Sequence, residues 1–482
     1  MVLKERGVCV MDALNNLVNT INGFLWDYII IVLLIGAGFW FTLITKFVQL
    51  RRLQEMVRLL GEGIGVKTAG NTISSFQAFC VSTASRVGVG NIAGIAIAVV
   101  LGGPGAIFWM WFIAFIGAAT GFIESTLAQI YKEPTKGGGF HGGPAYYIRY
   151  GLKSPALAFL FAVLISVTYG LIYNSVQANT ISASLKTFNV DPMLCGIVVA
   201  VLTAISIFGG VARIAKMTEW IVPIMAGIYI LTALYIVLMN IGELPAVFAA
   251  IFTKAFTFDA ASGGFFGAAL MNGIKRGLFS NEAGEGSVPN AAATADVSHP
   301  AKQGLIQSFG VFVDTFLICT ASAFIVMVSG NYETSGLTGI ALVQHDLGLQ
   351  LGSWAPGVMV IFIFMFAFSS IIGNYYYGEI NILHLSKNRV YLNIFRVFVV
   401  AMVYFGSTAS LNLVWNLADL FMAFLVLTNI LSILVLGRLA IIALNDYFRQ
   451  KEVGIEEPVF DRSILPNLEG VVWWHKDAKH PE

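Results

Sequence analysis

The segment Val87-Gly88-Val89-Gly90-Asn91-Ile92-Ala93-Gly94 places glycines and an asparagine inside a long apolar stretch of the chain. A second segment of this kind occupies the corresponding position in the other half of the sequence, Gly277-Leu278-Phe279-Ser280-Asn281-Glu282-Ala283-Gly284-Glu285-Gly286-Ser287. A helix break at membrane depth exposes backbone groups for which lipid offers no hydrogen-bond partner. Two interrupted helices in matching positions therefore indicate a site for a transported ion and solute near the middle of a bilayer.

The composition supports a membrane location. Of the 482 residues, 57% are hydrophobic and only 11% are charged, whereas soluble proteins have about 25% charged residues. The net charge is +1 and no basic patch alternates with aromatic residues, so no nucleic-acid partner is expected. The sequence predicts an all-α polytopic protein of the plasma (inner) membrane, embedded in the lipid bilayer.

Eleven apolar segments are long enough to be membrane-spanning helices, which need about 20 residues each. They are residues 23–47, 74–100, 104–130, 155–178, 191–209, 214–240, 262–290, 300–329, 356–385, 391–407 and 411–444.

Basic residues in the connecting loops predict the orientation, because cytoplasmic loops carry an excess of Lys and Arg. The excess appears in every second loop, beginning with Arg51, Arg52 and Arg58 after the first segment. The alternate loops 101–104 and 408–410 contain no basic residue. We therefore expect the N-terminus outside the cell and the C-terminus in the cytoplasm.

The two breaks fall in the second and seventh segments, which lie five segments apart and cross in opposite directions. This spacing predicts a 5+5 inverted repeat, with residues 70–240 as the first five-span unit and residues 260–445 as the second. Residues 1–50 would contribute a peripheral helix, and residues 446–482 a cytoplasmic tail. Adjacent tryptophans in this tail fit either an interfacial aromatic segment or a disordered one.

The first break has groups suited to a cation and a carboxylate. Gly88 and Gly90 allow the helix to unwind, because glycine adopts dihedral angles that other residues avoid. Carbonyl groups at the end of the first half-helix favour a cation, and amide groups at the start of the second half favour a carboxylate. Asn91 can add a side-chain oxygen. The alternative interpretation is a helix crossing packed through glycines, which is common in membranes.

The second break concentrates charge within an apolar segment. It holds Glu282 and Glu285, and Lys275 and Arg276 come directly before it. A charge inside the membrane costs roughly 3 kcal/mol or more unless it is paired or hydrated. Either these residues line a water-filled cavity, or Lys275 and Arg276 pair with the two glutamates and hold the break open.

Further polar residues lie within other apolar segments. Asp314 has no obvious local partner and is interpreted as a sodium ligand or as the partner of Arg86. Ser369 and Ser370 can offer hydroxyl oxygens to a sodium ion, although membrane serines usually bond to their own helix. Gln177 can line a solute cavity or form an interhelical hydrogen bond.

Four stretches resemble the alanine or glycine:cation symporters, the sodium:alanine symporter family. They are residues 84–94 (ASRVGVGNIAG), 101–106 (LGGPGA), 142–148 (GGPAYYI) and 276–284 (RGLFSNEAG). The resemblance extends from about residue 70 to residue 445, and FSNEAG is its most specific motif. It implies the leucine-transporter type of fold, sodium coupling, and a small neutral amino acid as cargo.

The resemblance also implies the residues that bind the cargo. They come from both breaks and from the fourth segment: Val89, Gly90, Asn91, Gln177, Phe279, Ser280 and Glu282. The first three would meet the carboxylate of the amino acid. Phe279 would act as a steric lid, and Gln177 would close the pocket.

A sodium ion is implied in the same way. Its ligands would be oxygen atoms of Ala84, Val87, Ser369 and Ser370. Asp314 is the candidate ligand of a second sodium ion beside Asn91. Arg86 replaces the small residue of amino-acid transporters of the wider fold, and it would fill or neutralise this second site.

The predicted function is sodium-coupled symport of a small neutral amino acid, alanine or glycine, into the cell by alternating access. The alternative is a proton-coupled permease of the same architecture, in which Glu282 or Asp314 carries the proton. A channel is disfavoured because the sequence has no selectivity-filter motif. No nucleophile–base set or metal-ligand pattern suggests an enzyme. The sequence does not indicate the oligomeric state.

Overall fold

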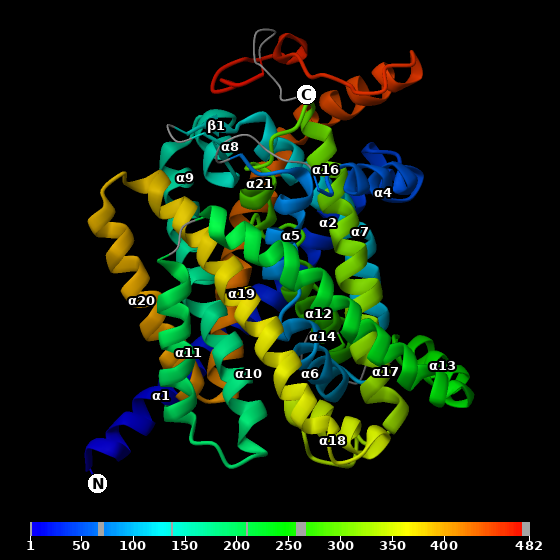
Figure 1. The fold of residues 1–482 in the computed structure, drawn as a ribbon, viewed down its shortest axis with the longest axis vertical. Helices are drawn as coiled ribbons and strands as arrows, with labels where there is room; N and C mark the ends of the chain where they lie inside the picture. Colours follow the sequence, from blue (N-terminus) through cyan, green and yellow to red (C-terminus); the bar gives the residue numbers. More distant parts are fainter. Residues whose placement is uncertain (1, 66–71, 136–137, 209–210, 257–266, 475–482) are drawn as a thin grey trace.

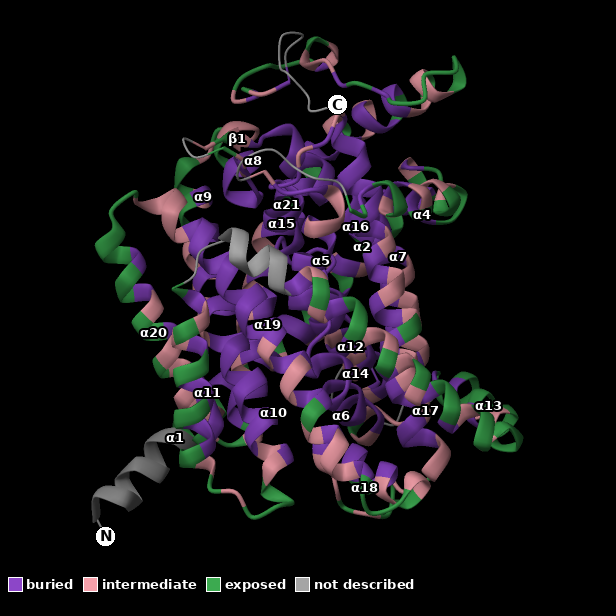
Figure 2. Ribbon diagram, in the orientation of Figure 1, coloured by how far each residue is buried: buried purple, intermediate pink, exposed green. Residues whose placement is uncertain are grey.

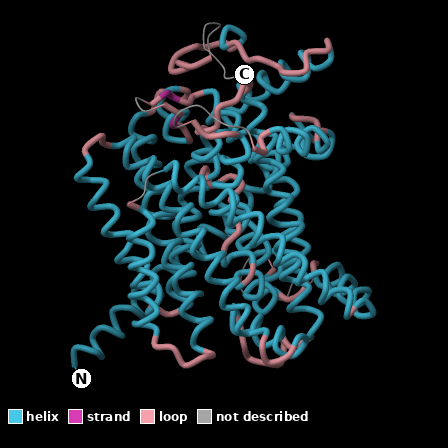
Figure 3. The backbone as a smooth tube through the Cα atoms, viewed as in Figure 1, coloured by secondary structure: helices cyan, strands magenta, loops and turns pink. Residues whose placement is uncertain are grey.

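The computed structural model describes residues 2–65, 72–135, 138–208, 211–256 and 267–474, with only the backbone described for residues 2–12, 14 and 211–217. Helices run side by side through most of the molecule (Figure 1). The start of α1 and the described end of the C-terminal tail lie at opposite ends of this bundle. Figure 3 shows that loops are concentrated at the two ends, as expected for a chain that crosses a membrane repeatedly.

The first half of the chain forms thirteen helices among the described residues. They are α1 (Val2–Leu25), α2 (Ile31–Ile44), α3 (Val48–Arg51), α4 (Leu53–Glu62), α5 (Ser75–Arg86), α6 (Ala93–Gly102), α7 (Gly105–Ile130), α8 (Pro144–Tyr150), α9 (Pro155–Val167), α10 (Asn174–Lys186), α11 (Pro192–Ile207), α12 (Val211–Met239) and α13 (Leu244–Lys254). The strands β1 (Glu133–Pro134) and β2 (Phe140–His141) pair antiparallel before α8.

The second half begins with two helices, one on either side of the second break. The described helices of this half are α14 (Ala268–Asn281), α15 (Val288–Ala292), α16 (Pro300–Phe312), α17 (Thr320–Ser329), α18 (Gly339–Leu351), α19 (Ala355–Leu385), α20 (Arg389–Thr408) and α21 (Leu411–Glu452). Three wider, π-helical turns interrupt long helices among the described residues: η1 (Trp26–Ile30) joins α1 to α2, η3 (Thr168–Tyr173) joins α9 to α10, and η6 (Val313–Cys319) joins α16 to α17. Such turns often mark functional positions.

Every predicted apolar segment overlaps a helix or a pair of helices. Within the described residues, eight helices are long and apolar enough to cross a membrane, and the bent pair α5–α6 would make nine. The seventh predicted segment begins at residues 262–266, which lie outside the described residues. Eleven crossings and the inverted repeat therefore stay predictions, whereas the all-helical membrane architecture is confirmed.

Figure 2 shows that buried residues occupy the centre of the bundle and that exposed ones lie on its outer helices and at its ends. Large hydrophobic residues such as Leu231 on α12, Val397 on α20 and Val435 on α21 are exposed. A soluble protein rarely exposes so much apolar area, which agrees with a membrane location. The buried centre contains many polar residues as well.

The tail after α21 packs against the end of the bundle instead of separating from it. Trp474 is fully buried, and its indole nitrogen donates to the carbonyl of Gln129 (2.8 Å). The backbone of Phe460 donates to Ser298 (3.0 Å). The disordered alternative is therefore wrong for the described part of the tail.

A short backbone contact connects the two halves near the same end. Ile73, before α5, and Ala295, after α15, form an isolated parallel bridge. The amide of Asp296 donates to the carbonyl of Ile73 at 2.9 Å. The contact holds the start of one interrupted helix against the end of the other.

Candidate functional site

The first break separates α5 from α6 by a bend of 58°. Val87 leaves the helical conformation, and a single 3-10 turn, η2 (Val89–Asn91), precedes α6. A Cβ atom on Gly88 would overlap the hydroxyl of Ser370 and lie 3.0 Å from Oε1 of Gln177. Glycine is therefore required at position 88, because the unwound chain passes between α19 and α10.

The second break lies between α14 and α15. Glu282 ends α14 in a left-handed conformation (φ 59°), which is uncommon for a residue other than glycine. Gly284 and Gly286 also have positive φ. The side chain of Asn281 accepts a hydrogen bond from the amide of Ala283 (3.0 Å) and caps one exposed backbone group. Both interruptions thus occur where the glycine-rich motifs predicted them.

Asp314, in the π-helical turn η6, connects the two breaks. Its Oδ1 accepts from Nδ2 of Asn91 in the first break (2.6 Å), and its Oδ2 accepts from the hydroxyl of Ser280 in the second (2.7 Å). Thr315 also donates to Oδ2, at 3.1 Å. The structure therefore brings Asn91, Ser280 and Asp314 together, and the carboxylate is surrounded by donors.

Gln177, on α10, contacts the first break directly. Its Oε1 accepts a hydrogen bond from the amide of Val89 at 3.1 Å. Within the break, the side chain of Asn91 accepts from the amide of Gly88 at 3.0 Å. Gln177 thus binds the amide of Val89, which the resemblance assigned to the carboxylate of a solute.

Ser369 and Ser370, adjacent on α19, point to different neighbours. The hydroxyl of Ser370 donates to the carbonyl of Ala84 at 2.8 Å, close to the end of α5. The hydroxyl of Ser369 donates to its own helix at Phe366 (2.9 Å) and lies 3.7 Å from the sulfur of Met225. The structure brings Ser370 to the expected ion site and turns Ser369 away from it.

Glu282 is held by hydroxyl groups from both breaks. Ser85 of α5 lies 2.8 Å from its Oε1, and Ser287 donates to its Oε2 at 2.6 Å. The hydroxyl of Ser85 also lies 2.6 Å from Oδ1 of Asn374 on α19. Glu282 therefore connects the second break to the first and, through Ser85, to α19.

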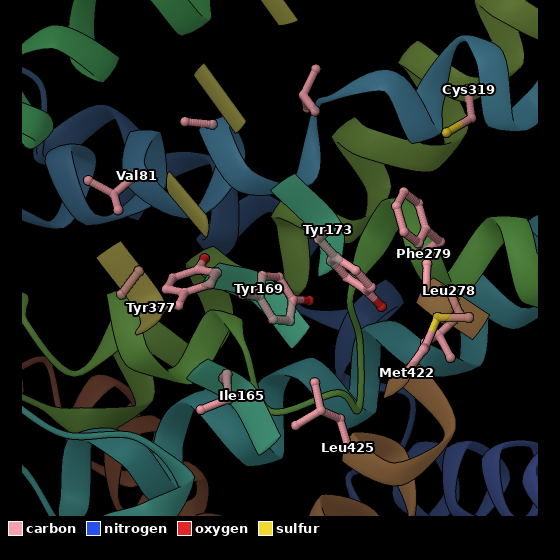
Figure 4. Packing of buried hydrophobic residues seen from close by; sticks show 14 of the residues in the cluster. Val81, Ile165, Tyr169, Tyr173, Leu278, Phe279, Cys319, Tyr377, Met422 and Leu425 are labelled. Carbon is pink, nitrogen blue, oxygen red and sulfur yellow. The ribbon is translucent and has the colours of Figure 1, made fainter. Parts of the chain in front are cut away.

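Phe279 covers the first break. A Cβ atom on Gly90 would lie 2.6 Å from its ring, so the glycine and the ring are in direct contact. The ring packs between Tyr173 (centroids 4.6 Å apart) and Trp415 on α21 (4.8 Å). Figure 4 shows Phe279 and Tyr173 side by side. The role of Phe279 as a steric lid stays a prediction.

Residues 11–462 match the profile of the sodium:alanine symporter family. The chain belongs to this family. Its members are transporters, so this symporter is a multi-pass membrane protein that carries an amino acid together with a cation.

Individual relatives match over nearly the whole length of the symporter. It is 51% identical to the probable sodium/glutamine symporter GlnT of Bacillus subtilis, over 96% of this chain and 97% of that protein. It is 48% identical to the amino-acid carrier protein AlsT of the same species, over 96% and 98%. The sodium/alanine symporter AgcS of Methanococcus maripaludis is 39% identical, over 88% and 94%.

A solved structure shows the same fold. A manganese transporter mutant from Eremococcus coleocola superposes with a TM-score of 0.50, covering 80% of this chain and 88% of that chain. Sequence identity is only 11%, so the match concerns the fold of the symporter alone.

The basic residues before the second break have a different partner from the expected one. Arg276 pairs with Asp419 on α21 at 2.6 Å, and Lys275 lies 3.7 Å from the same carboxylate. The guanidinium also stacks over Trp415, 4.5 Å from the ring centroid. The hypothesis that Lys275 and Arg276 pair with Glu282 and Glu285 is therefore wrong, because α14 directs its basic side chains toward α21.

Arg86 does not neutralise Asp314 directly. Among the ion pairs of the described residues, none joins these two side chains. The guanidinium of Arg86 donates to the carbonyl of Gln307 at 3.3 Å, and its Nε and second terminal nitrogen have no hydrogen-bond partner. Of the two interpretations of Asp314, pairing with Arg86 is the one that the geometry contradicts.

Several residues of the site were missed in the sequence. They are Ser85, Tyr169, Tyr173, Ser287, Asn374 and Trp415. Ser85 and Ser287 lie next to or inside the breaks, so their position was a usable signal. Asn374 follows Ser370 by four residues and thus shares its helix face, which was another.

Proposed function

We propose that this symporter couples sodium entry to the uptake of a small neutral amino acid, alanine or glycine. The observation that carries the proposal is the convergence of both breaks on Asp314, which accepts from Asn91 at 2.6 Å and from Ser280 at 2.7 Å. Interrupted helices that face one another supply carbonyls for a cation and amides for a carboxylate. A free amino acid presents that carboxylate.

The proposed sodium site lies at the end of α5. The carbonyls of Ala84 and Val87 and the hydroxyl of Ser370 would be its ligands, and the 2.8 Å contact between Ser370 and Ala84 supports this. Asp314 is the candidate ligand of a second ion. Since Ser369 faces Met225, it contributes to the site only through the packing of α19.

The proposed cargo site lies between η2 and Phe279. The carboxylate would take the amides of Val89 and Gly90, and Gln177 would release Val89 to allow this. Phe279 limits the size of the side chain, because its ring already touches Gly90. A pocket bounded in this way rejects larger cargo sterically. Asn91, Ser280 and Glu282 would complete the wall.

Binding of the two substrates is then cooperative. Sodium stabilises the unwound end of α5, which orders the amides that receive the carboxylate, so each substrate increases the affinity for the other. The second, third, seventh and eighth predicted segments would move as a bundle against the remaining helices, in a leucine-transporter type of 5+5 repeat. With the N-terminus outside, the cargo is released into the cytoplasm.

The test is uptake of radiolabelled alanine by purified protein in proteoliposomes. An inward sodium gradient alone should drive saturable accumulation, and unlabelled glycine should compete. Unlabelled glutamine is the larger competitor, and the pocket proposed above should reject it sterically. Accumulation driven by a pH gradient alone, without sodium, would contradict the proposal in favour of a proton-coupled permease.

A further inference from the structure

Glu285, in the second break, has an incomplete set of hydrogen bonds. It is fully buried, and its Oε2 accepts from the hydroxyls of Tyr169 (2.7 Å) and Tyr173 (3.0 Å). Its Oε1 has no hydrogen-bond partner. Figure 4 shows the two tyrosines next to each other on η3. A buried carboxylate oxygen without a donor is costly, so this oxygen requires an explanation.

The other buried carboxyl groups of the region do not share this feature. Both oxygens of Asp314 have donors, as described above, and Glu282 has Ser85 and Ser287. Glu124, on α7, accepts from the amide of Gly284 (3.1 Å) and from Nδ2 of Asn429 (2.7 Å). Of these four carboxyl groups, Glu285 is the one with an oxygen left bare.

The surrounding charges disfavour an ionised Glu285. The titratable groups that face it are the carboxyl groups of Glu282, in the same break, and Glu124, on α7, together with the phenols of Tyr169 and Tyr173. No ion pair of the described residues includes Glu285. Two neighbouring carboxyl groups, together with the absence of an ion pair to any described cation, favour the neutral acid.

We propose that Oε1 of Glu285 carries a proton in this conformation, and that the proton is released when the second break separates from η3. This inference rests on the proposed function, because Glu285 belongs to the moving bundle whereas Tyr169 and Tyr173 belong to the fourth span. Separation exposes the acid to water. The O–H bond then breaks and the proton passes to water. Before the break closes again, the carboxylate takes a proton back from water.

Protonation thus becomes a condition for closing the bundle against the fourth span. Sodium-driven uptake should fall as the pH rises, approaching about tenfold per pH unit once the carboxyl group ionises in the open state. Glu285→Gln cannot ionise and still offers an amide oxygen to both tyrosines. It should therefore make uptake insensitive to pH across this range.

The experiment measures initial alanine uptake in proteoliposomes under a fixed inward sodium gradient, with equal pH on both sides, from pH 5.5 to pH 9. Glu379→Gln is the matched control, since Glu379 is a buried carboxyl group on α19 that pairs with Arg396 instead (3.5 Å). The control should keep the profile of the unmodified protein, whereas Glu285→Gln should be flat.

A second variant keeps the test decisive if Glu285→Gln does not fold. Tyr173→Phe removes one donor to Oε2 in the closed state, which destabilises the ionised form there and should deepen the loss of uptake at high pH. A flat profile for the unmodified protein, or an unchanged profile in Glu285→Gln and Tyr173→Phe, would overturn the inference. Failure of the proposed function is a different result, namely no sodium-dependent uptake at any pH.

Discussion

A terminal guanidinium nitrogen of Arg276, in α14, lies 2.6 Å from each carboxylate oxygen of Asp419, in α21. The two residues are 143 positions apart in the sequence, and both are nearly fully buried. Because α14 belongs to the proposed bundle and α21 to the remaining helices, the pair connects the two bodies that alternating access would separate.

Asp419→Asn should destabilise the folded protein by about 3 kcal/mol or more, since it leaves Arg276 buried without a counter-charge. Thermal unfolding of the purified protein in detergent measures this. Lys275→Met is the control and should cost much less, because Lys275 lies 3.7 Å from Asp419 and is more exposed. Equal losses in both variants would contradict a dominant Arg276–Asp419 pair.

Ser370→Ala should raise the sodium concentration for half-maximal uptake by about tenfold, the effect of losing an interaction of about 1.4 kcal/mol. Ser369→Ala is a matched neighbour whose hydroxyl bonds to Phe366 of its own helix (2.9 Å), and it should leave the sodium dependence almost unchanged. Sodium titration of the initial uptake rate compares the two. A larger rise in the half-maximal sodium concentration for Ser369→Ala than for Ser370→Ala would place the ion site at Ser369.

Gln177→Ala should weaken binding of the amino acid, because Gln177 closes the pocket over Val89 (3.1 Å). We expect about a tenfold rise in the dissociation constant, from the loss of one polar contact to a charged ligand. Ser175→Ala, whose hydroxyl bonds to Ile172 within the same helix (2.6 Å), should leave affinity unchanged. Equilibrium binding of labelled alanine distinguishes the variants, and equal affinities would remove Gln177 from the pocket.

Gly90→Ala should abolish uptake, because the new methyl group would lie 2.6 Å from the ring of Phe279. That ring has little room to move between Tyr173 and Trp415. Combining Gly90→Ala with Phe279→Leu should recover part of the activity, since leucine leaves space for the methyl group. A double-mutant cycle on uptake rates tests the contact, and strictly additive losses would argue against it.

Trp474 and Lys132 should give the unfolding transition a pH dependence. Burial lowers the pKa of Lys132 to about 7, below its ordinary value of about 10.4. Between these values the unfolded chain binds more protons than the folded one, so stability should rise with pH across this window and level off below pH 7. Trp474, whose ring centroid lies 4.7 Å from the Lys132 ammonium group, contributes to this burial. Trp474→Ala should flatten the slope of unfolding temperature against pH, and an unchanged slope would contradict this.

The sequence was most informative where backbone requirements are strict. Glycine at 88 and 90, and buried charge after Gly277, predict interrupted helices, because few other structures tolerate these residues at membrane depth. Side-chain partners distant in sequence were not predictable. Asp419 has no basic residue near it in the sequence, and only the packing of α21 against α14 reveals its pairing with Arg276.

Adjacent residues with the same chemistry posed a related difficulty. The sequence pattern makes Ser369 and Ser370 equally good candidates for a sodium ligand, because it does not fix the rotation of α19 about its axis. In the folded protein, the 100° between successive residues of a helix decides which hydroxyl reaches Ala84. The docking of Trp474 depends in the same way on an acceptor at Gln129, 345 positions away.

The bridge between Ile73 and Ala295 gives the two interrupted helices a common anchor at one end. Tilting α5 would displace the chain that leaves α15, so the two half-helices should move together as one unit and not independently. A distance reporter attached near either half-helix would then register the opening of both. Loss of the bridge between Ile73 and Ala295 would uncouple the two movements without altering any ligand of the ion or the solute.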